Sequence, residues 1–247
     1  MTANDILALK QLWQEAFGDT ADFTDLFFST GFSPDRFHCI REKGLPVSAL
    51  YWFDCTLQGR KIAYIYGVAT LKSHRGKGLA GQLLEETHSL LRKRGYAGVV
   101  LVPHGASLFD FYRRFGYETA VTATEFSCNA GDSPVAIREI GIDEYTRLRS
   151  SFLPEGGVEL REDMPVFLQT YCKFYAGADF LLICEALPDG LWTQELLGNA
   201  QTAPGILKAL GFTKGRFRIP GTGRDFAMWL PLQVNCPKPT WFGPALD

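Results

Sequence analysis

The sequence predicts an α+β fold organised around a mixed β-sheet, and three observations carry that prediction. Residues 6–17 place apolar side chains at helical spacing and end at Gly18, which predicts an amphipathic helix. Residues 36–42, 46–57 and 61–71 are rich in β-branched and aromatic side chains and are separated by short turns, which predicts an antiparallel meander. A strand–loop–helix–strand pattern follows the meander, so the sheet is expected to be mixed.

The remaining elements of the first half alternate between helix and strand. In chain order they are a short helix over 22–30, a long helix over 79–91, a buried strand over 98–102, a short helix over 107–116 and a strand that ends near 127. Ser107 and Asp110 have the spacing of a capped helix start. The strand over 61–71 is apolar on both faces, which indicates a central position in the sheet.

Residues 128–135, CNAGDSPV, predict a linker, because small, turn-prone and proline residues cluster there. Two domains are therefore expected, over 1–128 and 134–247. The second half predicts strands and helices in an order that echoes the first, over 135–140, 143–153, 162–176, 179–187, 191–198, 203–211 and 226–232. FYRRFGYE and ILKALGFT share a short helix ended by glycine and an aromatic residue, which suggests a duplicated unit. Since many helices end in this way, these two eight-residue segments do not decide whether the unit is duplicated.

Composition excludes several classes of function. Lys and Arg total 25 against 27 Asp and Glu, a formal charge of -2, so no bulk field recruits nucleic acid or an anionic membrane. The N-terminus lacks the pattern of a signal peptide, and no segment is apolar and long enough to cross a bilayer. The six cysteines are scattered without C-x-x-C spacing, and the four histidines form no metal motif, so we expect a metal-free cytoplasmic protein with reduced thiols.

A glycine-rich segment, RGKGLA over 75–80, lies between a predicted buried strand and the long helix. The free N–H groups of a helix's first turn favour an anion, and glycines let a phosphate approach the backbone closely. Arg75 and Lys77 add positive charge. The segment is not a P-loop, because Gly78 follows Lys77 where a serine or threonine is required. We therefore expect it to hold a phosphate or pyrophosphate.

The pattern R-x-x-G-x-A, after a strand that ends in Val68-Ala69-Thr70, resembles the acetyl-CoA loop of the GNAT acyltransferase superfamily. The resemblance covers about residues 5–127 and is most specific in GVATLKSHRGKGLAGQLLE and SLFDFYRRFGYE. It implies the GNAT acyl-CoA N-acyltransferase fold and acetyl-CoA as cosubstrate. The cofactor-binding residues that it implies are Val68, Ala69 and Thr70 along the pantetheine arm, Arg75, Gly76, Lys77, Gly78, Leu79 and Ala80 at the pyrophosphate, and Ser107 and Leu108 beside the pantetheine.

By the same resemblance, Tyr112 matches the tyrosine that many of these enzymes place near the thioester sulfur. A neutral phenol there can protonate the departing CoA thiolate, which makes Tyr112 the candidate general acid. The catalytic base stays open among His104, just past Pro103, and the strand carboxylates Asp54 and Glu42.

A complete unit followed by a reduced one is similar to the enhanced-intracellular-survival group of acetyltransferases, some of which use the chain-terminal carboxylate as base. Here that group would be Asp247, after an apolar end, PTWFGPALD. The chain departs from that group because it is short, has no third domain and shows no strand before its first helix. The second domain is expected to be GNAT-like but degenerate, since it lacks R-x-x-G-x-A and has Leu207 where Tyr112 would stand.

The predicted function is direct transfer of an acetyl group from acetyl-CoA to a small-molecule or peptide amine bound between the two halves. The alternative is a non-catalytic acyl-CoA-binding module that uses its second domain to contact a partner. The sequence decides neither the identity of the amine nor the oligomeric state.

Overall fold

A computed structural model describes residues 2–161 and 163–245. The elements of the first half are α1 (Ala3–Phe17), α2 (Ala21–Leu26), β1 (Phe37–Glu42), β2 (Leu45–Leu57), β3 (Arg60–Thr70), α3 (Leu79–Lys93), β4 (Gly98–Leu101), α4 (Ala106–Arg113) and β5 (Glu118–Asn129). Those of the second half are β6 (Arg138–Ile140), α5 (Ile142–Phe152), β7 (Glu159–Leu160), α6 (Asp163–Gln169), β8 (Lys173–Ala176), β9 (Phe180–Leu187), β10 (Gly190–Gly198), α7 (Ala203–Leu210), β11 (Lys214–Pro220) and β12 (Arg224–Pro231).

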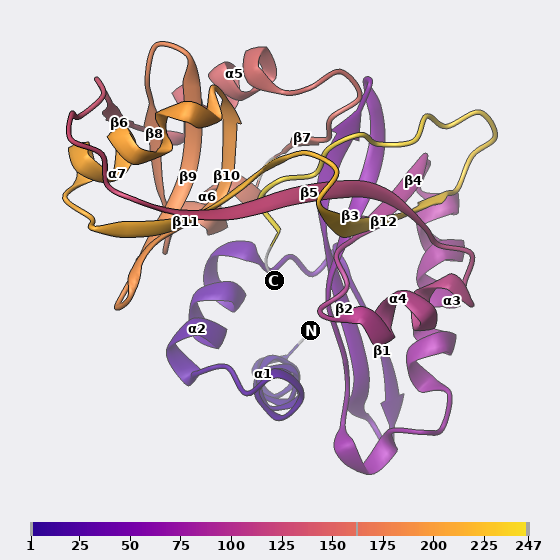
Figure 1. Cartoon of the computed structure of the whole chain (residues 1–247). Helices are drawn as coiled ribbons and strands as arrows, with labels where there is room; N and C mark the ends of the chain where they lie inside the picture. The colour runs from indigo at the N-terminus through magenta and orange to yellow at the C-terminus, as the bar shows by residue number, and fades with distance from the viewer. Residues whose placement is uncertain (1, 162, 246–247) are drawn as a thin grey trace.

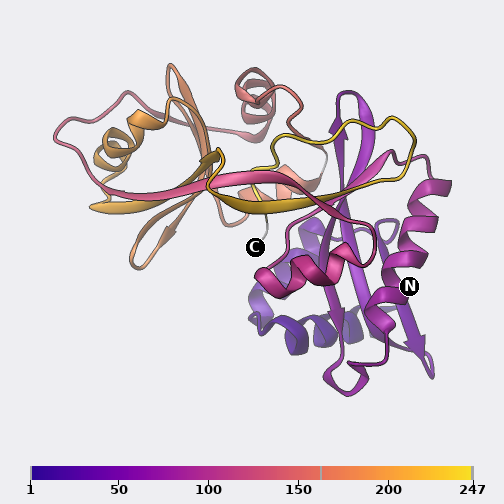
Figure 2. The same ribbon diagram turned by 45° about the vertical axis from the view of Figure 1, so that its right-hand side comes forward.

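One continuous sheet joins the two halves, in the order β1-β2-β3-β4-β12-β5-β11-β10-β9-β8-β6 (Figure 1). The order is symmetric about its centre: β3 and β4 form a parallel pair, as do β10 and β11, and each half sends its last strand beside the other half's parallel pair. β5 and β12 consequently run side by side from one unit to the other (Figures 1 and 2). This exchange of strands agrees with a duplicated unit.

The symmetry corrects one comparison made from the sequence. α7 lies between β10 and β11, as α3 lies between β3 and β4. The topological counterpart of α7 is therefore α3, and Leu207 on α7 does not occupy the place of Tyr112 on α4. The connection from β11 to β12 is a short turn over 221–223, so the second unit has no counterpart of α4.

The sheet is covered on both faces in the first half. Along β2 and β3, Tyr51 and Tyr64 point into the cluster that contains Trp13 of α1, whereas Trp52 and Ile65 point into the cluster under α3 and α4. The alternation explains why these strands are apolar on both faces. Figure 1 shows α1 and α2 on one side of these strands and α3 and α4 on the other.

The second half also completes the first. β12 pairs with β4, β7 pairs with Cys55 and Thr56 of β2, and Phe167 of α6 packs on Phe27 with ring centroids 5.5 Å apart. The predicted linker coincides with the end of β5 and the segment after it. The ranges 1–128 and 134–247 stay a prediction as domains, and in space they share strands and a core.

The structure differs from the predicted elements in several places. Only 163–169 of the helix expected over 162–176 is helical in the described residues, because residues 173–176 form β8 against β9. β11 was not expected, since its exposed face is charged; it is a strand because Gly215 and Phe217 point inward and its backbone pairs with β5 and β10. α4 begins after Gly105 and has no side-chain cap, so Ser107 lies inside the helix.

Candidate active site

The parallel pair at the centre of the first unit separates along its length. Three residue pairs join the two strands: Ile62 with Gly98, Ala63 with Val99 and Tyr64 with Val100. β3 continues to Thr70, but in the described part of the chain no residue beyond Tyr64 pairs with β4. The backbone of β3 after Tyr64 therefore presents an open edge to the space beside α4.

An irregularity in β3 shapes this open edge. Ala69 pairs with Ala49 of β2 and Tyr66 with Tyr51, which leaves Gly67 and Val68 outside the regular register. Gly67 has φ +63°, and a Cβ on it would lie 2.7 Å from the Trp13 ring. Only glycine meets both conditions. α1 thus packs directly on the bulge and fixes the course of the following residues.

A cavity of about 610 Å³ lies where the strands separate. Its walls are the end of β3, the loop and first turn of α3, one face of α4 and the last turn of α1. The lining residues are Ala16, Phe17, Val68, Ala69, Thr70, His74, Arg75, Gly76, Gly78, Leu79, Ala80, Gly81, Leu108, Phe111, Tyr112, Arg114 and Phe115. Of the predicted cofactor-binding residues, all line this cavity except Lys77 and Ser107, whose side chains are exposed.

The glycine loop has the geometry of an anion site. Gly76 and Gly78 have φ +77° and +79°, a left-handed backbone that favours glycine. Gly78 is the N-cap of α3 and supplies no side-chain acceptor, so the first-turn amides of the helix lack a side-chain cap. The Nε of Arg75 donates to the carbonyl of Thr70 at 3.1 Å, which holds that guanidinium beside the end of β3.

Gly81 explains the close approach of α3 and α4. A Cβ at this position would lie 2.7 Å from the Phe115 ring, so the turn after α4 packs on a surface of α3 that carries no side chain. Gly76, Gly78 and Gly81 also have the G-x-G-x-x-G spacing of dinucleotide loops. Such a loop requires an acidic residue after the second strand, whereas Val102, Pro103 and His104 follow β4, and the two strands separate.

Tyr112 lies on α4 and reaches the cavity from a buried position. Burial raises the pKa of its phenol, so the hydroxyl is protonated at neutral pH. Among residues 2–161 and 163–245, no hydrogen bond involves this hydroxyl. Tyr112 is therefore a neutral donor facing the cavity, as general acid catalysis requires.

Several lining residues were not expected from the sequence. Phe17 comes from α1, 51 positions before Val68, and no local motif links them. Phe111 precedes Tyr112 on α4, and Arg114 and Phe115 belong to the turn that follows this helix. His74 also lines the cavity, and its Nε2 lies 2.7 Å from a carboxylate oxygen of Glu42.

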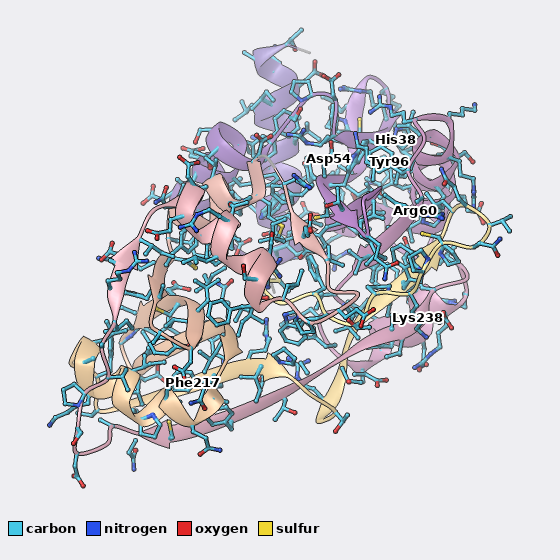
Figure 3. All side chains as sticks on the ribbon, turned by 90° about the horizontal axis from the view of Figure 1, so that it is seen from above. His38, Asp54, Arg60, Tyr96, Phe217 and Lys238 are labelled. Carbon is cyan, nitrogen blue, oxygen red and sulfur yellow. The ribbon has the colours of Figure 1, made fainter. Side chains whose placement is uncertain are left out.

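The candidate bases lie in different places. His104 is exposed and does not line the cavity. Glu42 pairs with His74 at the cavity rim. Asp54 does not line the cavity: its carboxylate lies 3.0 Å from Lys61 Nζ and accepts a hydrogen bond from Tyr96. Asp54 and Tyr96 are labelled in Figure 3. An acceptor-facing role for Asp54 is thus not supported by its position.

Asp247 lies outside the described residues, but the segment before it is docked. Trp241, Phe242 and Ala245 are buried, and the Phe242 ring lies 4.5 Å from that of Tyr64, centroid to centroid. Tyr64 is the residue at which β3 separates from β4. The apolar chain end therefore packs on the protein as far as Ala245.

The separated parallel pair, the glycine loop and the tyrosine-bearing helix around one cavity are the architecture of a GNAT acyltransferase. Residues 1–120 match the family model described as an acetyltransferase (GNAT) domain, so the first half of the chain is a GNAT domain. No curated protein matches the chain in sequence.

Solved structures share the fold over nearly the whole chain. A GCN5-related N-acetyltransferase from Kribbella flavida is 18% identical, with a TM-score of 0.69, over 94% of this chain and 71% of that one. A GCN5-related N-acetyltransferase from Anabaena variabilis is 14% identical, with a TM-score of 0.73, over 94% and 72%. Eis1 from Mycobacterium abscessus is 13% identical, with a TM-score of 0.66, over 95% and 72%. The GNAT fold with a large mixed sheet that the sequence predicts is confirmed.

The described residues contain neither a metal-binding cluster nor a membrane-spanning helix. No group of three or more His, Cys, Asp and Glu side chains within 2–161 and 163–245 is arranged to hold a metal ion. Over the same residues, no helix has the length and apolar character needed to span a membrane.

Proposed function

We propose that this protein is an acetyl-CoA-dependent N-acetyltransferase that transfers the acetyl group directly to an amine. The observation that carries the proposal is the convergence on one cavity of an open strand edge, an uncapped glycine-rich helix start and a protonated phenol. Each of these groups suits a different part of an acyl-CoA thioester.

The residues that would hold acetyl-CoA follow from the chemistry of the walls. Backbone groups of Val68, Ala69 and Thr70 would bond the amides of the pantetheine arm, as a further strand would. The amides of the loop from Gly76 to Ala80 would bind the diphosphate, with Arg75 beside it. Leu108 would pack on the apolar part of the arm, whereas Lys77 and Ser107 are assigned weaker, peripheral contacts.

Acetyl-CoA would supply an acetyl group activated as a thioester. Residues of the chain would orient the thioester. They would also give one proton to the sulfur and take one proton from the amine. As a C–N bond to the amine forms and the C–S bond breaks, Tyr112 gives its proton to the sulfur and recovers one from solvent. A base takes the proton that the attacking amine loses.

For the base, the proposal favours the chain-terminal carboxylate of Asp247, supported by the docking of Phe242 on Tyr64. A chain that ends at Leu246 should lose turnover and keep its affinity for CoA, and His104→Ala should change neither. Full turnover without Asp247 excludes Asp247 as the base, although the shortened chain still ends in the carboxylate of Leu246. A loss of turnover with His104→Ala makes that histidine the candidate base again.

A panel of amines tests the function as a whole. Purified protein is mixed with acetyl-CoA and each amine, and released CoA thiol is measured with a chromogenic disulfide. The proposal expects thiol release that depends on at least one amine and an acetylated product of matching mass. Tight CoA binding without release for every amine class supports the alternative, a non-catalytic acyl-CoA-binding module with a partner-binding second domain.

We also propose that the protein acts in the cytoplasm. All six cysteines are free, which agrees with a reducing compartment. The acceptor is proposed to be a small-molecule or peptide amine that binds between the two units.

A further inference from the structure

The cavity leaves one question about Tyr112: which residues hold its phenol in place. Its ring meets the ring of Phe111 at 5.1 Å and that of Tyr117 at 5.7 Å, both edge to face. Because the described residues offer its hydroxyl no hydrogen bond, ring packing sets the direction of the phenol. Phe111 is a neighbour on the same helix and itself half-exposed, so the fixed side of this packing is Tyr117.

Tyr117 is held at both ends. Its backbone N–H donates to the carbonyl of Tyr112 at 3.4 Å, just past the left-handed Gly116. Its hydroxyl lies 2.8 Å from Nε2 of His88, and the two rings lie 5.4 Å apart. Tyr117 and His88 are 3% and 4% exposed, so each is the partner that satisfies the other's buried polar group.

His88 lies on α3, the helix whose first turn forms the glycine loop. A single buried hydrogen bond therefore connects the helix of the proposed diphosphate site to the residue that packs on the proposed acid. Burial, and to a smaller extent Arg92, lowers the pKa of His88 to about 4, so the imidazole is neutral and its Nε2 can accept a hydrogen bond from the Tyr117 hydroxyl.

We propose that His88 is a positioning residue for catalysis: through its hydrogen bond to Tyr117, it fixes the ring that orients Tyr112 toward the thioester sulfur. This inference rests on the proposed function. It adds a residue outside the cavity and outside the motifs that suggested the fold. Neither His88 nor Tyr117 touches the cavity, so neither is assigned a chemical step.

A double-mutant cycle tests the inference. His88→Leu and Tyr117→Phe each remove the hydrogen bond, and Tyr117→Phe keeps the ring. Each should lower kcat roughly 3- to 30-fold, below the ~10²-fold that a misplacement of about 1 Å can cost. KM for acetyl-CoA should stay within about twofold, and the double variant should be no slower than the slower single variant, because both remove one interaction.

Two further variants separate positioning from general damage. His88→Gln carries an amide that can reach the Tyr117 hydroxyl, and it should restore most of kcat. Thr87→Val removes a different buried hydroxyl from the same helix, one that donates to the Leu83 carbonyl at 2.7 Å, and it should leave kcat unchanged. Additive losses in the double variant, no rescue by glutamine, or an equal loss with Thr87→Val would overturn the inference.

Ring-labelled tyrosine NMR provides a readout that does not depend on turnover. The Tyr112 signal, assigned with Tyr112→Phe, should shift or broaden in His88→Leu and return in His88→Gln. If Tyr112→Phe slows turnover while His88→Leu changes neither the Tyr112 NMR signal nor kcat, the positioning role of His88 is wrong, and Tyr112 remains the proposed general acid. If Tyr112→Phe itself leaves turnover unchanged, the acid assignment fails, whatever the NMR spectra show.

Discussion

The indole Nε1 of Trp241 donates a hydrogen bond to Oε1 of Glu195 at 2.7 Å, and both residues are almost completely buried. Glu195 lies on β10 of the second unit, and Trp241 stands one residue before Phe242, which packs on Tyr64 in the first. The bond therefore fixes the chain end between the two units. The same carboxylate accepts two bonds from Arg149, each 2.8 Å long.

Breaking this buried ion pair should destabilise the fold. Arg149→Leu leaves the Glu195 carboxylate without its cation, so we expect the free energy of unfolding in urea to fall by about 3–5 kcal/mol. Arg149→Leu combined with Glu195→Leu removes both charges and should recover part of that loss. A single variant as stable as the original protein would show that the pair does not support the docked chain end.

Charge reversal at the glycine loop should weaken CoA binding unequally. Arg75 lines the cavity and Lys77 does not, so Arg75→Glu should raise the Kd for CoA roughly tenfold, or ~1.4 kcal/mol, and Lys77→Glu clearly less. Calorimetric titrations at two salt concentrations should show the difference shrinking as salt rises. If both variants bind CoA with the same affinity as the original protein, the proposal that this loop binds the diphosphate is wrong.

Removal of the phenol should affect chemistry and spare binding. Tyr112→Phe should lower kcat by ~10²-fold or more, the usual contribution of general acid catalysis, with the Kd for CoA unchanged. Tyr175→Phe, on β8 of the second unit and outside the cavity lining, is the matched control and should be neutral. Rapid-quench measurement of a single turnover separates the chemical step from product release. An unaltered chemical step in Tyr112→Phe would exclude this tyrosine as the acid.

The contact of Gly81 with Phe115 should be sensitive to a single methyl group. Alanine favours a helix by ~1 kcal/mol over glycine, but its Cβ would enter the Phe115 ring at 2.7 Å. Overpacking of this kind costs about 1–3 kcal/mol, so Gly81→Ala should lower the thermal midpoint. Adding Phe115→Leu should relieve the clash, and the double variant should then be more stable than Phe115→Leu alone. If the double variant is no more stable than Phe115→Leu, the close packing of Phe115 on α3 does not depend on glycine at position 81.

Acid should destabilise the protein in part through His88. Its pKa is about 6.5 unfolded and about 4 folded, so the unfolded state binds a proton first as the pH falls. The loss of unfolding free energy that His88 causes is close to zero above pH ~7 and grows to ~3 kcal/mol by pH ~4. Urea unfolding at a series of pH values should therefore show a smaller acid loss in His88→Gln than in the original protein. Parallel curves would mean that this histidine does not titrate on unfolding in that range.

Local patterns in the sequence were sufficient for much of the first unit. The period of α1, the meander of β1 to β3 and the glycine loop before α3 are each encoded within a few residues. The helical period of α4 also placed Tyr112 next to the residues that line the cavity. Lys77 was included with its neighbours because spacing alone does not reveal that the turn directs its side chain outward.

The second unit was harder to predict because its elements depend on distant partners. Residues 173–176 continue a helical pattern but form a strand, since their backbone groups pair with β9. β11 carries charge on its exposed face and becomes a strand because β5 and β10 supply hydrogen bonds on both sides.

The sequence by itself determined the class of fold and the glycine loop, because those depend on local periodicity and on the conformational freedom of glycine. The acid candidate came from the resemblance of its helix to the GNAT superfamily. Only the tertiary structure decided that the halves exchange β5 and β12, that Phe17 joins the cavity wall and that the segment up to Ala245 is docked between the units. Such relations come from strand pairing and packing between residues far apart in the chain. No local pattern encodes them, since the free energy that selects them is gained only when the whole sheet forms.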